Sequence, residues 1–286
     1  MTGGTLSDLK GLTEPAKVLI ERISDAVGGL ARPWQIERLA RAEGRAEVIR
    51  AEARIAVSEV EQRAIRRLVH EEGRKQENIE SIAEQAADQV RSDAKPEEIE
   101  ADWLTAFFDR CRGISDREMQ AIWAKMLADE ANGPGTYQRK TIDLLSTLSR
   151  QDAELFSGLK IISLETIDRI VPLVYDHDSD ILKKHGFDFE TLNRLAELGL
   201  INFSVSSNFH LNVNVNNLPV KYGDQRLILQ LKEDRKFDTG RMLFTRSGSE
   251  LIRLCPSIVD QAVLEWWMEI WNSKGIQPIS DVKAFG

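Results

Sequence analysis

The chain has 286 residues, of which 42% are hydrophobic and 29% charged; this predicts two or three structural units and argues against wholesale disorder. The formal net charge of -8 argues against broad, sequence-independent nucleic-acid binding, because neutralising phosphates needs a basic surface. The two cysteines, Cys111 and Cys255, lie far apart without a Cys-x-x-Cys pair, which indicates no disulfide framework and favours a reducing, cytoplasmic location.

Membrane and export signals are not evident in the sequence. No apolar stretch approaches the ~18–20 residues that cross a bilayer, and the start MTGGTLSDLKGL lacks the basic and apolar regions of a signal peptide. We therefore expect neither a membrane span nor a signal peptide.

A helical, coiled-coil-like arm is predicted over residues 1–94. Apolar residues recur at steps of three and four within residues 6–30, and residues 34–92 contain no proline in a composition favourable for helix. Gly73 is expected to act as a hinge within this second helix.

The arm is also predicted to be an interface. Its apolar seam is rich in alanine and buries little area, so a long helix of this kind needs a partner helix. The same arm of a second chain is the expected partner, which makes the protein a homo-oligomer. The seam residues expected at this interface are Ile49, Ala53, Ala56 and Val60.

A central helical domain is predicted over residues 95–163. Pro96 followed by two glutamates is typical of a helix start, and closely spaced amphipathic helices follow. Their aromatic residues can build a core; these are Trp103, Phe107, Phe108, Trp123, Tyr137 and Phe156.

An α+β domain with a winged-helix character is predicted over residues 164–286. A helix over residues 188–198 is followed by a clearly alternating strand over 209–218, by strands over 227–231 and 241–244, and by two final helices. The fold class expected for the whole chain is therefore mainly α, with a long N-terminal arm, a central helical domain and a C-terminal α+β domain.

Three stretches of the chain resemble a known family. The run IWAKMLADEANGPGTYQRKTIDLLSTLSRQDAELF, with LAELGLINF and LFTRSGSELIRLC further on, resembles an uncharacterised bacterial domain-of-unknown-function family. It is more remotely similar to the abortive-infection alpha family associated with phage resistance. The matching positions are packing and capping residues, so the resemblance implies a shared fold and a defence context, and it implies no active site.

One string of residues resembles a metal site. Asp176, His177, Asp178 and Asp180 place three carboxylates and an imidazole within five residues. The spacing departs from that of a calcium loop, which needs a turn glycine and a distal bidentate acid. A solvated loop or helix cap is the alternative reading, and we expect no bound cofactor.

Arginines form the densest positive series, in the arm. Arg38, Arg41 and Arg45 fall on one side of the predicted helix and could bind an anion such as phosphate, although interleaved glutamates are also typical of a solvated face.

The last predicted helix is unusually aromatic. Trp267 and Trp271 share one face at i, i+4. They would either dock this helix onto its own domain or anchor a partner.

These observations favour a non-enzymatic, oligomerising interaction protein, placed in antiviral defence by the resemblance. One alternative is a nucleic-acid-binding regulator that uses the winged-helix-like domain and the arm arginines. Another is a metal-dependent enzyme that uses the cluster from Asp176 to Asp180.

Overall fold

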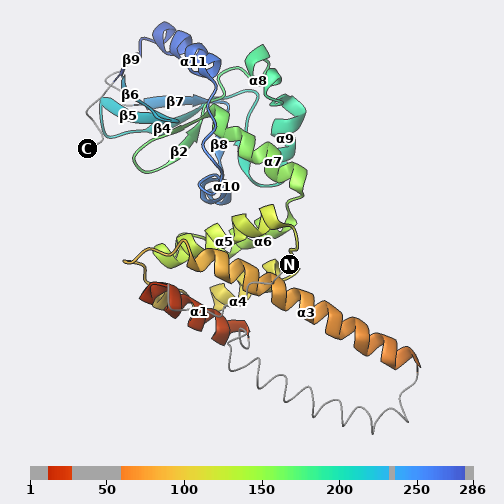
Figure 1. Cartoon of the computed structure of the whole chain (residues 1–286). Coiled ribbons are helices and arrows are strands. Elements are labelled where there is room, and N and C mark those ends of the chain that lie inside the picture. Colours follow the sequence, from red (N-terminus) through yellow and green to blue (C-terminus); the bar gives the residue numbers. More distant parts are fainter. Residues whose placement is uncertain (1–11, 28–58, 232–235, 281–286) are drawn as a thin grey trace. The chain divides into compact units, whose positions relative to one another are not determined.

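The computed structural model describes residues 12–27, 59–231 and 236–280. Contacts between residues divide the chain into two units, residues 1–142 and 143–286 (Figure 1). The three-part division expected from the sequence differs from this one, because the second half of helix α3 (Glu59–Ala87) packs into the same unit as the helices that follow it.

The first unit is built from helices in its described part. They are α1 (Glu14–Val27), α3, η2 (Pro96–Glu98), α4 (Ala101–Cys111), α5 (Arg117–Asn132) and the start of α6 (Arg139–Thr147). Helix α3 packs along α5, while α1 lies against η2, α4 and α3. The break before η2 follows from Pro96, which occupies the first turn of a helix without losing a hydrogen bond.

Aromatic residues of α4 and α5 form the centre of this unit. The Phe107 ring stacks on Trp103 with centroids 5.1 Å apart and meets the edge of Trp123 at 5.2 Å. The indole N–H of Trp103 donates to the carbonyl oxygen of Tyr137 at 2.8 Å, which satisfies a polar group that is otherwise buried. The predicted aromatic core is therefore confirmed at these positions.

Two buried amides join α3 to α5. The side chain of Gln120 donates to the Asn78 side-chain oxygen at 3.1 Å and to the carbonyl of Ile114 at 2.8 Å. Asn78 in turn donates to the carbonyl of Arg112 at 2.9 Å. Buried amides of this kind fix the register of two helices, because a shift of one helix along the other would leave a buried donor without an acceptor.

The second unit mixes helices and strands. Its helices are the rest of α6, α7 (Arg150–Gly158), η3 (Leu159–Ile162), α8 (Asp180–Lys184), α9 (Phe189–Glu197), α10 (Arg246–Leu251) and α11 (Gln261–Ser273). Its strands are β1 (Ser163–Glu165), β2 (Ile170–Pro172), β3 (Ile201–Phe203), β4 (Phe209–Asn212), β5 (Asn217–Tyr222), β6 (Gln225–Gln230), β7 (Lys236–Gly240), β8 (Met242–Phe244) and β9 (Gln277–Ser280).

The described strands form three antiparallel sheets. The largest has five strands in the order β2-β1-β5-β6-β9, and the pairs β3-β8 and β4-β7 form two smaller sheets. The single strand predicted over residues 209–218 is in fact two, because β4 pairs with β7 whereas β5 pairs with β6.

Side-chain caps start several helices of the second unit. Ser149 and Asp152 form the capping box of α7, and Asp188 caps α9 by accepting from the amide of Thr191. Arg194 on α9 pairs with buried Asp152 at 2.7 Å, so the cap of one helix also holds another. The hydrogen bond from the Ser149 hydroxyl, with the Arg194 guanidinium, keeps the pKa of Asp152 below its ordinary value.

The expected fold class is wrong. The nine strands of the described residues make the C-terminal half a mixed α/β unit dominated by a multi-stranded antiparallel sheet. This contradicts the mainly α class with a long helical arm. The prediction failed because short strands with little alternation are difficult to recognise in a sequence. Among the described residues, no helix combines the length and apolar composition that a bilayer crossing requires.

Candidate functional site

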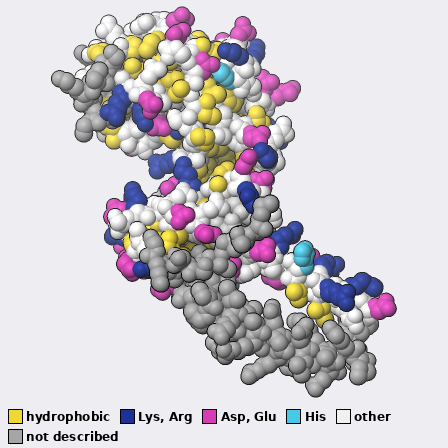
Figure 2. All heavy atoms as spheres, viewed as in Figure 1, with side chains coloured by type: hydrophobic (Ala, Val, Ile, Leu, Met, Phe, Trp, Pro, Cys, Tyr) yellow, Lys and Arg dark blue, Asp and Glu magenta, His cyan; other side chains and the backbone are white. Residues whose placement is uncertain are grey.

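The first half of α3, residues 59–74, which we call the outer half of α3, leaves apolar side chains uncovered. All eight residues from Arg63 to His70 are exposed, so no other element among the described residues buries a face of these two helical turns. Figure 2 shows apolar and basic side chains next to one another on this part of the helix. The exposed apolar side chains are Val60 (66%), Ile65 (50%), Leu68 (58%) and Val69 (59%).

The same helix is well packed farther along. Ile65 and Leu68 lie at heptad steps from Ile79, Ile82 and Ala86, which are buried, but Glu72 and Lys75 occupy the heptad positions between the two groups. The buried apolar face of α3 therefore ends before the outer half, where Ile65 and Leu68 form a separate exposed apolar group that a partner could cover.

Intrahelical ion pairs accompany the exposed face. Arg63 lies 3.6 Å from Glu59 and Arg67 lies 3.8 Å from Glu71, both between well exposed side chains. Lys75 donates to Glu72 at 2.6 Å, and this hydrogen bond lowers the pKa of Glu72. Exposed pairs of this spacing contribute only about 0.2–0.5 kcal/mol each, so they do not replace the missing tertiary packing.

The predicted interface and anion-binding residues of the arm can be placed only in part. Val60 lies on the exposed surface of α3. The others lie outside the described residues, and their roles stay predictions; they are Ile49, Ala53, Ala56, Arg38, Arg41 and Arg45.

A second candidate lies in the segment after β2. Val174 runs beside the end of β7 and forms a parallel bridge with Gly240. The Val174 amide donates to Thr239 at 3.1 Å, and the Arg241 amide donates to the Val174 carbonyl at 2.7 Å. These bonds therefore hold Val174 against the end of β7.

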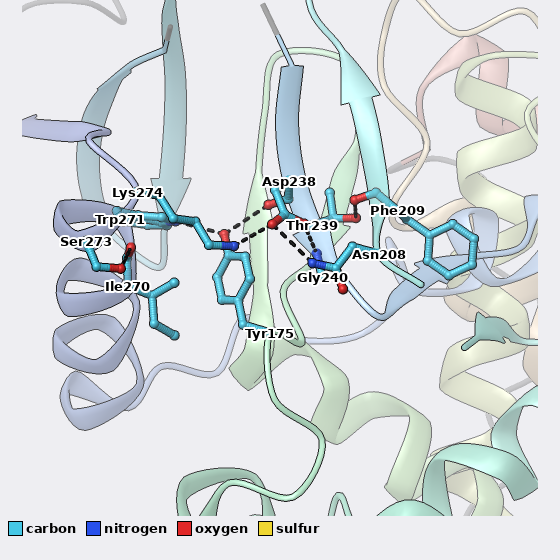
Figure 3. A network of polar contacts seen from close by, with 10 residues as sticks. All are labelled: Tyr175, Asn208, Phe209, Asp238, Thr239, Gly240, Ile270, Trp271, Ser273 and Lys274. Atoms are coloured by element: carbon cyan, nitrogen blue, oxygen red, sulfur yellow. Dashed lines mark hydrogen bonds and ion pairs between the residues drawn. The ribbon is translucent and has the colours of Figure 1, made fainter. Parts of the chain in front are cut away.

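A polar network fixes the side chain of Tyr175, the next residue of this segment (Figure 3). Its hydroxyl accepts from the Trp271 indole at 2.9 Å and donates to the backbone carbonyl of Asp238 at 3.0 Å. Lys274, at the C-terminal end of α11, pairs with the Asp238 carboxylate and lies 4.3 Å from the centroid of the Tyr175 ring. The network thus connects α11, β7 and the segment after β2.

The network is suited to structure more than to proton transfer. Burial raises the pKa of the Tyr175 hydroxyl above its ordinary value. Burial also raises the pKa of Asp238, but the hydrogen bonds from Lys274 and the Gly240 amide outweigh it and hold that pKa below the ordinary value. Both shifts lead away from neutral pH, so each group keeps its usual neutral-pH form.

The two predicted interface tryptophans belong to this interior. Trp267 and Trp271 are both completely buried, and the Trp267 ring meets Tyr222 with centroids 5.1 Å apart. They dock α11 onto its own unit, which was one of the two roles expected for them, and they offer no surface to a partner.

Three of the predicted metal-binding residues do come together. Ligand atoms of Asp176, His177 and Asp178 all lie within 4.8 Å of one another, whereas Asp180 begins α8. Together these residues have the donor types of a metal site.

The contacts of His177 argue against a metal. Nδ1 of His177 lies 2.8 Å from the Arg241 guanidinium, which can only donate, so the ring nitrogen must accept. In the neutral ring the proton then resides on Nε2, which faces Asp178 at 3.4 Å. Neither nitrogen has a free lone pair for a cation, and the nearby guanidinium would repel one.

Rings from two other elements surround this histidine. His177 lies 6.2 Å from Phe189, at the start of α9, and 5.8 Å from Phe203, in β3, and the two phenylalanines lie 6.1 Å apart. Phe189 is 47% exposed. We call Asp176, His177, Asp178, Phe189 and Phe203 the acidic-aromatic patch. The sequence analysis missed the two phenylalanines, because their contact joins three separate elements.

The comparisons with known proteins give one match. Residues 62–266 match the model of a family described as "Protein of unknown function (DUF2806)". No curated protein and no solved structure matches the chain. The family match confirms the resemblance to a domain-of-unknown-function family, while the remoter likeness to abortive-infection alpha proteins stays a prediction.

Proposed function

We propose that this chain, which belongs to the DUF2806 family of proteins of unknown function, is a non-enzymatic interaction protein that self-associates through the outer half of α3. One observation supports the proposal most: two full turns of this helix, from Arg63 to His70, are exposed on every side and carry Ile65, Leu68 and Val69. A helix in water without tertiary packing is marginally stable. A second copy would supply the missing contacts.

The acidic-aromatic patch does not favour the alternative of a metal-dependent enzyme. His177 offers no lone pair to a metal while it accepts from Arg241, and the hydroxyl of Tyr175 is engaged with Trp271 and the Asp238 carbonyl. The other alternative, a regulator that binds nucleic acid, is not favoured by the charges on α9. The helix α9 exposes Glu190 and Glu197, and its Arg194 is paired with Asp152, so its surface would repel phosphate.

A more specific role, in antiviral defence, is also part of the proposal. This role depends on the remote likeness of the stretches named in the sequence analysis to abortive-infection alpha proteins. Self-association is compatible with such a role, and the experiment below does not depend on it.

The proposal is tested by light scattering coupled to chromatography over a range of concentrations. Replacing Ile65 and Leu68 together with glutamate puts two charges on the exposed apolar face, and we expect this variant to be monomeric while the parent assembles. The matched control carries glutamate at Gln151 and Gln230, two exposed positions of the second unit, and should assemble like the parent. A parent that stays monomeric at tens of micromolar would contradict the proposal.

A further inference from the structure

We draw no further inference here: the strongest candidate, the groove of about 330 Å³ in the second unit between the turn that joins β1 to β2 and the segment that joins β4 to β5, presents the exposed apolar side chains of Ile167 and Val215, and nothing in the structure shows what covers it.

Discussion

Gly240 passes so close to Val174 that a Cβ atom on Gly240 would lie 2.1 Å from the Val174 carbonyl oxygen. Its φ angle of 77° also lies in the left-handed region that glycine adopts most easily. Only glycine lets the segment after β2 run directly against the end of β7, two residues before Asp176 of the acidic-aromatic patch.

Gly240→Ala should therefore destabilise the second unit by more than its backbone conformation alone would cost. Gly199 is the matched control, because its φ is 76° and nothing lies within 4 Å of its added Cβ. We expect Gly199→Ala to cost about 1–2 kcal/mol, which is the penalty for the left-handed conformation, and Gly240→Ala to cost clearly more in urea unfolding. Equal losses in the two variants would show that the contact with Val174 relaxes easily.

The ion pair between Asp238 and Lys274 predicts a pH dependence. The pKa of Asp238 in the folded chain lies below its ordinary value, so its charged form stabilises the fold. This contribution is fully present above pH ~4, the ordinary range of an aspartate, and is lost as the pH falls through the folded-state pKa.

Asp238→Asn should accordingly lower the free energy of unfolding at neutral pH by about 1 kcal/mol. Its stability should then fall less steeply than that of the parent below pH ~4. Thermal unfolding across this range measures both effects. Parallel pH profiles of parent and variant would show that Asp238 contributes nothing through its charge.

Trp123 tests the core of the first unit. It is completely buried and meets the ring of Phe107, so Trp123→Ala leaves a large cavity and should cost about 3–5 kcal/mol. The change is followed by denaturant unfolding with circular dichroism. An unchanged midpoint would place the stabilising core of this unit elsewhere.

The cluster around His177 is predicted to bind no divalent metal. Changing Asp176, Asp178 and Asp180 together to asparagine should leave the melting temperature equally insensitive to added magnesium, calcium or zinc as in the parent. A melting temperature that rises with metal in the parent, and not in the triple variant, would refute this reading and support a metal-dependent enzyme.

Helices were easier to predict from this sequence than strands. The periodic aromatic residues of α4 and α5 and the capping residues Ser149 and Asp188 act over a few neighbouring positions, so they can be read locally. The strands β1, β2 and β9 have three or four residues each. Strands of this length show too little alternation to be recognised, and the fold class was wrong mainly for this reason.

The candidate surfaces were predictable to different degrees. Val60 was expected at an interface and is exposed, although Ile65 and Leu68, which carry the proposal, were not singled out. The cluster of Asp176, His177 and Asp178 was visible because the residues are adjacent. The contact of His177 with Arg241 spans 64 residues, so no local sequence pattern could predict it. This contact occupies the lone pair that the histidine would otherwise offer to a metal.

The most direct test of self-association through α3 is amide hydrogen exchange measured by mass spectrometry at low and high micromolar concentration. We expect exchange over residues 63–70 to slow as the concentration rises, because a second copy then covers this unpacked helix. Residues 79–87, which belong to the part of α3 that packs on α5, serve as the internal control and should exchange equally slowly at both concentrations. Fast exchange over residues 63–70 at every concentration would contradict the account.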